Sequence, residues 1–250
     1  MSKKTFPRAI SIDCEMVGCG ENGHISVLGR IAVVDDKLKL LMDAFVKPSM
    51  KVTNFRTKWS GLTWDKLKYG ESFESIQKKF LQIVEHYRKE STSGLVFVGH
   101  DISNDFQVLK WTPPESEIRD TCTYFPLRKL LIKSLLEKGE ITHHQKEGFL
   151  RQKPSLRSLS KHVLNLNIQQ GSHCPWEDAK STMMLYLMVR DRWEALICNR
   201  NSITNSPTTI AVNYEQNEDL GETVVSLNKK KKNKKKKNIK KGKHVTINGK

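Results

Sequence analysis

Extended and helical runs follow one another along the chain in an order that narrows the choice of fold. Residues 9–12, 25–36 and 38–46 are extended runs with short connections, so we expect consecutive antiparallel strands. Apolar positions then recur at helical spacing over about 72–89, and the fully apolar run 95–98 is typical of a strand buried on both faces. The order predicts an α/β fold with a mixed sheet of about five strands, three antiparallel and then parallel, flanked by helices.

The remaining elements are expected by the same criteria. Asp101 or Ser103 is placed to cap a helix that runs to about Leu109, and Pro175 suits the first position of the last helix, which continues to about Cys198. We also expect a strand at 118–121, helices at 127–136 and 155–164, and a polar loop at 139–154.

Positive charge is concentrated at the C-terminal end. The chain has 43 Lys and Arg against 27 Asp and Glu, a net charge of +16, and residues 201–250 hold 12 Lys and 4 acidic residues. A lysine run this dense buries too little apolar surface to fold. We therefore predict one folded domain at 1–200 that carries the activity, a disordered polar linker at 201–228 and a disordered Lys-rich tail at 229–250. Such a tail attracts polyanions and is typical of a nuclear or nucleolar address, or is a solvated segment without a specific partner.

Several classes of protein are disfavoured. The longest uninterrupted apolar run, Met183–Val189, is far shorter than the roughly 20 residues of a membrane-spanning helix, so we expect no membrane partner. The first dozen residues lack the apolar segment of a secretory signal. Five Cys without a CxxC pair argue against a disulfide scaffold and suit a reducing compartment. Nothing marks an oligomer interface, so we expect a monomer.

Two acidic residues are expected at the end of the first strand. Asp13 and Glu15 are two residues apart, and strand alternation puts both on one face with Cys14 on the other. Carboxylates this close repel each other unless a cation lies between them. Taken alone, the pair also fits an exposed strand end with two solvated acids.

Three further residues complete a candidate site. Asp105 is expected in the first turn of a helix that follows a buried strand, His173 just before the last helix, and Asp178 one turn into it. Each acid on its own could merely complement a helix dipole. Together, four carboxylates suit two hard divalent cations about 4 Å apart, Mg²⁺ or Mn²⁺, and a neutral His beside them can take a proton from water. In a basic protein, this set indicates phosphodiester hydrolysis of nucleic acid.

The motifs around these residues resemble those of the DEDDh 3′→5′ exonucleases. The resemblance is closest to the subfamily of the interferon-stimulated exonuclease, RNA exonuclease 4 and apoptosis-enhancing nuclease, and it extends over about residues 8–195. The matching blocks are Ile12–Gly18 (IDCEMVG), Phe55–Gly61 (FRTKWSG), Val98–Phe106 (VGHDISNDF), Arg119–Thr121 (RDT) and His173–Tyr186 (HCPWEDAKSTMMLY). The resemblance implies a ribonuclease H-like fold.

The resemblance also implies roles for single residues. Asp13, Glu15, Asp105 and Asp178 would be the metal ligands, and His173 the general base. Met16 would contact the terminal nucleotide and Arg56 a phosphate or ribose near it. The implied reaction is hydrolysis of single-stranded RNA from its 3′ end to nucleoside 5′-monophosphates, in RNA or rRNA processing.

Two alternatives remain open at this point: a DNA 3′→5′ exonuclease, and a non-catalytic nucleic-acid-binding protein that acts through its tail. Other polar and aromatic residues receive structural assignments. We expect His100 to be a satisfied turn histidine, Asp120 to bond turn amides, and Trp59, Trp64 and Trp111 to belong to the core or a lid rather than to a stacking surface.

Overall fold

The computed structural model describes residues 5–204, with side chains up to residue 198. Its centre is a six-stranded sheet in the order β3-β2-β1-β5-β6, with β4 paired to β1. The strands are β1 (Arg8–Cys19), β2 (Ile25–Asp35), β3 (Leu40–Phe45), β4 (Val52–Asn54), β5 (Leu95–Gly99) and β6 (Ile118–Asp120). β1, β2 and β3 pair antiparallel, whereas β5 runs parallel to β1 and β6 parallel to β5. The predicted mixed sheet is confirmed, and β4 is an additional short strand.

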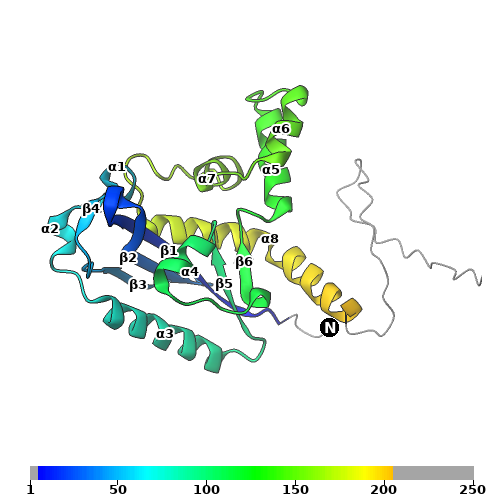
Figure 1. The fold of residues 1–250 in the computed structure, drawn as a ribbon. Coiled ribbons are helices and arrows are strands. Elements are labelled where there is room, and N and C mark those ends of the chain that lie inside the picture. The colour runs from blue at the N-terminus through cyan, green and yellow to red at the C-terminus, as the bar shows by residue number, and fades with distance from the viewer. Residues whose placement is uncertain (1–4, 205–250) are drawn as a thin grey trace, which may run out of the picture. The chain divides into compact units, whose positions relative to one another are not determined.

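Helices cover this sheet and extend beyond it (Figure 1). They are α1 (Thr57–Ser60), α2 (Trp64–Leu67), α3 (Phe73–Glu90), α4 (Ser103–Leu109), α5 (Phe125–Glu137), α6 (Lys146–Arg151), α7 (Leu156–Val163) and α8 (Pro175–Thr204). Short 3-10 turns lie at Glu21–Gly23, Glu115–Glu117 and His143–Gln145. Ser72 caps α3 by accepting from the Ser75 amide, and α8 begins at the predicted proline.

The main core lies between the sheet and α3. Ile10, Ile12 and Cys14 of β1 project into it and meet the buried face of α3. That face consists of Ile76, Phe80, Val84 and Tyr87. Because side chains alternate along a strand, Asp13 and Glu15 project from the opposite face of β1, and α8 lies on that side of the sheet in Figure 1. The strand thus separates the core from the acidic residues.

The loop predicted at 139–154 is partly wrong, because Lys146–Arg151 forms α6. The turn before it is held by a capping box between Thr142 and Gln145. Phe149 and Leu150 pack against a second apolar cluster. That cluster is built mainly by α5 and α7, and it includes Leu127, Leu131, Leu156, Leu159 and Leu185. A tertiary contact therefore stabilises a helix whose own sequence is mostly polar.

The chain divides into two compact units at Ala195, so the last residues of α8 belong to the second unit. Residues 201–204 are helical, although the linker was predicted to begin at 201. The rest of the predicted linker and the whole predicted tail at 229–250 lie outside the described residues. Within 5–204, no helix combines the length and the apolar character needed to cross a membrane.

Candidate active site

β1 positions Asp13 and Glu15 in the middle of a strand, not at its end as predicted. The strand continues to Cys19 because its antiparallel pairing with β2 extends from Ile10↔Asp35 to Cys19↔Ile25. Backbone hydrogen bonds therefore hold the acidic segment extended, whatever its side chains are. The register shifts between Glu15 and Met16, which is the irregularity of a β-bulge just after the acidic pair.

Asp105 is brought to this segment by the parallel strand β5. Because β5 pairs with the start of β1, its carboxyl end leads directly to α4 beside the acidic pair. Asp105 is buried, and its Oδ1 accepts a 2.7 Å hydrogen bond from the backbone amide of Cys14. The predicted cap is wrong: Ile102 occupies the N-cap position and makes no side-chain cap, whereas Asp101 binds Lys153 instead.

α8 and the loop before it supply the remaining two residues. Asp178 is buried in the first turn of α8, and its Oδ2 accepts a 2.9 Å hydrogen bond from Gln169 Nε2. His173 Nδ1 lies 3.8 Å from the same Oδ2. One ligand atom each from Glu15, His173 and Asp178 lie within 4.8 Å of one another. Gln169, which the sequence analysis missed, thus orients an acid of the cluster.

The electrostatics of the cluster fit a cation. Burial, followed by the charges of Asp105, Asp178 and Glu15, raises the pKa of Asp13 well above its ordinary value. Burial together with neighbouring carboxylates raises the pKa of Glu15 to about 8, and burial raises that of Asp105 to about 7. Burial also raises the pKa of Asp178. Raised pKa values in four neighbouring carboxylates are expected where a bound cation normally offsets their negative charge.

One atom supports this fit independently of any pKa. Asp178 Oδ1 is buried and has no hydrogen-bond partner among the described residues. A buried carboxylate oxygen without a partner is costly unless it coordinates an ion. Together with the oxygen-rich donor set, it indicates that this cluster can hold a hard divalent cation.

Met16 and Arg56 are the two predicted substrate-binding residues. Met16 is partly buried and packs against the main core. Arg56 adopts a left-handed backbone conformation, with φ of 51°, directly before α1. Its guanidinium donates from Nη1 to Ser26 Oγ (3.0 Å) and from Nη2 to Gly23 O (3.1 Å). The guanidinium is thereby held against the connection between β1 and β2, and a role for either residue in substrate binding stays a prediction.

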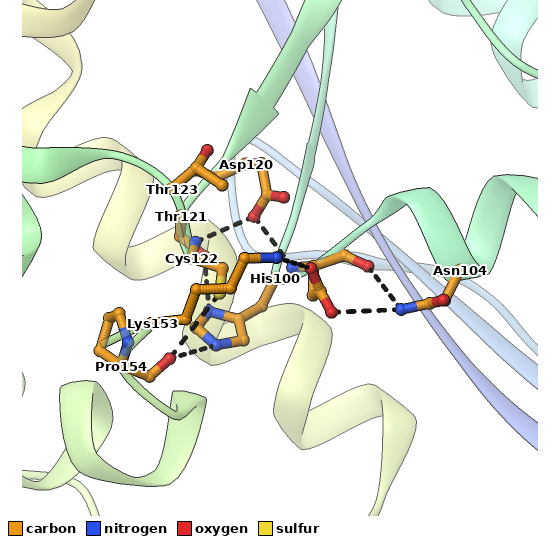
Figure 2. Close-up of polar contacts among 9 residues, drawn as sticks. His100, Asn104, Asp120, Thr121, Cys122, Thr123, Lys153 and Pro154 are labelled. Carbon is orange, nitrogen blue, oxygen red and sulfur yellow. Dashed lines mark hydrogen bonds and ion pairs between the residues drawn. The ribbon is translucent and has the colours of Figure 1, made fainter. Parts of the chain in front are cut away.

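His100 has the structural role predicted for it. Its ring nitrogens each have one partner: Nδ1 lies 3.0 Å from Thr121 Oγ1, and Nε2 lies 3.0 Å from Pro154 O (Figure 2). Burial lowers the pKa of His100, which favours the neutral ring, and Nε2 must carry the proton because the Pro154 carbonyl can only accept. His100 therefore links the end of β5 to the segment before α7.

Asp120 is likewise confirmed as a residue that bonds turn amides. Its Oδ1 accepts from the backbone amides of Asp101 and Cys122, each at 2.9 Å (Figure 2). Lys153 Nζ donates to Asp101 Oδ1 at 2.7 Å. These bonds fix the turn between β5 and α4, and with it the approach of Asp105 to β1.

The three tryptophans divide between two environments. Trp111 packs edge-to-face against Phe80 and Phe97, with centroid distances of 5.1 and 4.9 Å, so the prediction of a core residue is confirmed. Trp59 and Trp64 are 59% and 49% exposed, so they do not belong to the core.

Solved structures share this architecture. The catalytic unit of Neurospora crassa Pan2, comprising protease and nuclease domains, aligns with a TM-score of 0.55 and 20% identity over 82% of this chain and 31% of that one. A Saccharomyces cerevisiae Pan2 module with AAGGAA RNA aligns with a TM-score of 0.56 and 22% identity over 79% of this chain and 31% of the other. The chain thus has the ribonuclease H-like fold of exonuclease domains.

Sequence comparison defines the family. The family model described as Exonuclease matches residues 10–186, and the chain belongs to this family. RNA exonuclease 4 of Homo sapiens is 36% identical over 200 residues, which are 80% of this chain and 41% of the relative. Apoptosis-enhancing nuclease of Rattus norvegicus is 36% identical over 209 residues, 79% of this chain and 56% of the relative. The chain spans about half the length of these curated relatives. The resemblance drawn from the motifs is confirmed.

Proposed function

We propose that this protein is a metal-dependent 3′→5′ exoribonuclease that degrades single-stranded RNA to nucleoside 5′-monophosphates. The observation that carries the proposal is the convergence of Glu15, His173 and Asp178 within 4.8 Å, beside Asp13 and Asp105. Membership of the exonuclease family supports the reaction class, and RNA exonuclease 4 among its relatives favours RNA over DNA.

Asp13, Glu15, Asp105 and Asp178 would hold two divalent cations, Mg²⁺ or Mn²⁺. When bound, these ions neutralise the charge that develops on the attacking and leaving oxygens of an in-line displacement. Two observations support this ligand set: Asp178 Oδ1 has no hydrogen-bond partner within residues 5–198, and the pKa values of the carboxylates are raised. His173, which is partly exposed beside Asp178, accepts a proton from water.

The proposed reaction is hydrolysis of the terminal phosphodiester bond. The water oxygen bonds to the terminal phosphorus, the bond from phosphorus to the O3′ of the preceding nucleotide breaks, and that O3′ takes up a proton. The products are one nucleoside 5′-monophosphate and an RNA shortened by one residue with a 3′-hydroxyl. In this scheme Met16 contacts the terminal nucleotide, and Arg56 its phosphate or ribose, for which the guanidinium fork is suited.

The cellular setting is proposed from the basic tail. A Lys-rich segment at 229–250 would direct a monomeric enzyme to the nucleus and nucleolus, where it would act in RNA processing, including that of rRNA. Fusion of residues 201–250 to a fluorescent protein tests this directly. Nucleolar fluorescence is expected, and a diffuse distribution identical to that of the fluorescent protein alone would contradict it.

A time course on end-labelled strands tests the activity. With 5′-labelled single-stranded RNA we expect a ladder that shortens from the 3′ end, and with 3′-labelled RNA a labelled mononucleotide from the first turnover. Both should disappear with a chelator. Matched DNA strands measure the sugar preference, and faster degradation of DNA would reassign the substrate. Release of internal fragments would contradict exonucleolytic cleavage.

A further inference from the structure

The short helix α1 lies against the loop that carries the candidate general base, His173. The backbone amide of His173 donates a 2.6 Å hydrogen bond to the carbonyl oxygen of Trp59. A Cβ at Gly61 would lie only 2.7 Å from Ser172 Oγ, so the two segments are in close contact. Figure 1 shows the connection from α7 to α8 passing along α1. The helix α1 therefore lies next to the loop that carries His173.

That surface presents a large aromatic ring to solvent. Trp59 is 59% exposed, whereas the core residue Trp111 packs against three other aromatic rings. The ammonium of Lys58 lies 5.5 Å from the Trp59 ring centroid. Because Trp59 holds the His173 loop through its backbone, its indole is not needed for that contact.

The charge around Trp59 is positive. Arg56 and Lys58 flank it, and Lys66 Nζ lies nearby, bonded to the Gly61 carbonyl. The acidic residue closest in sequence, Asp65, is paired with Lys68 at 2.7 Å. An exposed indole beside ammonium groups is suited to a polyanion with flat bases, because a base stacks on the ring while a cation meets its phosphate.

We propose that Trp59 and Lys58 bind the single-stranded RNA segment on the 5′ side of the cleaved phosphodiester, an inference that rests on the proposed function. A strand whose 3′ end reaches the acidic cluster must leave along an adjoining surface, and α1 is the basic, aromatic surface that touches the His173 loop. Trp59 stacks on an upstream base, and Lys58 contacts a phosphate. The surface therefore determines how tightly the polymer is held, and not the chemistry at its end.

Two substrates separate these roles: a single-stranded RNA oligonucleotide, and a chromogenic nucleotide ester that has no upstream base. We expect Trp59→Ala in the full chain to raise KM for the oligonucleotide roughly 5- to 150-fold, the range of one lost base stack. Hydrolysis of the ester should stay within about twofold, since it cannot reach α1. Trp59→Phe keeps an aromatic face and should restore most of the affinity.

Tyr69→Ala is the matched control. Tyr69 is 84% exposed and also lies beside a lysine, with Lys68 Nζ 4.9 Å from its ring centroid, but it follows α2 and not α1. Its KM should equal that of the unmodified protein. Anisotropy of labelled RNA in chelator, at a salt concentration that weakens binding to the Lys run, should show the same order of affinities without turnover.

The outcomes distinguish this proposal from the proposed function. An unchanged KM and unchanged RNA binding in Trp59→Ala would overturn it. Equal losses on the oligonucleotide and the ester, not rescued by Trp59→Phe, would also overturn it, because Trp59 would then only support the His173 loop. If the unmodified protein hydrolyses neither substrate, the proposed function fails, and the anisotropy measurement still decides whether Trp59 binds RNA.

Discussion

The backbone amide of Cys14 donates a 2.7 Å hydrogen bond to the carboxylate of Asp105, which lies 91 residues further along the chain. This bond joins the middle of β1 to the first turn of α4. It serves the fold and the candidate site at once, because it fixes one acid against the strand that carries two others. A carboxylate held by a buried amide keeps its place even without a cation.

Asp105→Asn should separate the two roles of this residue. The amide oxygen of Asn can still accept from Cys14, while a negative charge is lost. We expect the free energy of unfolding in chelator to be unchanged or higher, because repulsion among the carboxylates falls, and the nuclease activity to be abolished. Asp105→Ala should destabilise the protein by about 1–3 kcal/mol, because it leaves a buried amide unpaired. Denaturant unfolding of both variants checks this, and equal stability losses in the two would contradict it.

The stability of the metal-free protein should depend on pH. The folded-state pKa values of Glu15 and Asp105, about 8 and about 7, lie above the ordinary values of 4.5 and 3.8 for these side chains. The folded state therefore binds more protons than the unfolded state between these values, so stability falls as pH rises from about 4 to about 8. Melting temperatures in chelator across this range test the sign.

The same titration has an internal control. Adding Mg²⁺ or Mn²⁺ at pH 8 should restore the melting temperature, because the ions compensate the ionised carboxylates. Asp105→Asn should show a shallower pH dependence in chelator. A melting temperature that rises from pH 5 to pH 8 in chelator would contradict the account of the cluster.

Gln169 should control how tightly the metal is held. Its amide donates to Asp178 Oδ2 at 2.9 Å, and Oδ1 has no hydrogen-bond partner in the part of the chain that the structure describes. Loss of a group that orients a metal ligand typically lowers metal affinity 10- to 100-fold, so Gln169→Ala should raise the half-saturating metal concentration by about this factor. The neighbouring exposed residue gives the matched control Gln170→Ala, which should behave like the unmodified protein. Identical metal dependence of the two variants would exclude this role for Gln169.

A buried ion pair outside the acidic cluster should contribute strongly to the free energy of unfolding. Arg119 Nε and Nη2 donate to the two carboxylate oxygens of Glu194 at 2.7 and 2.8 Å, and Tyr186 donates to the same group at 3.0 Å. Without Glu194, the guanidinium of Arg119 would be buried without an oppositely charged partner. Glu194→Ala should therefore destabilise the protein by about 3–5 kcal/mol. The double variant Arg119→Met with Glu194→Leu should recover much of this loss. Chemical denaturation of the single and double variants measures it, and additive losses would contradict the expected coupling.

The sequence predicted those elements that have strong local signals. Periodic apolar positions placed α3, and Pro175 placed the start of α8. The length of β1 escaped prediction because Asp13 and Glu15 look like the end of a strand, and only pairing with β2 shows that they are not. The four-residue helix α1 is too short for any periodicity to appear.

The sequence predicted some residues of the candidate site and missed others. The acids and His173 were predicted from motif spacing, and the structure brings Glu15, His173 and Asp178 together. Gln169 was missed because nothing in a single glutamine indicates a bond to an acid nine residues later. The exposure of Trp59 was missed for a related reason: a tryptophan has the same sequence signature in a core as on a surface, and only tertiary packing separates Trp59 from Trp111.

Titration of the chelator-treated protein with Mn²⁺, with RNA hydrolysis followed in the same samples, tests the central claim most directly. We predict two saturable sites per chain whose magnetic coupling in paramagnetic resonance places the ions close together, and activity that rises as the second site fills. Asp13→Asn, with its fold intact, should lose both the coupled signal and the hydrolysis. Full hydrolysis of RNA in the absence of any bound divalent ion, or in Asp13→Asn, would contradict the account.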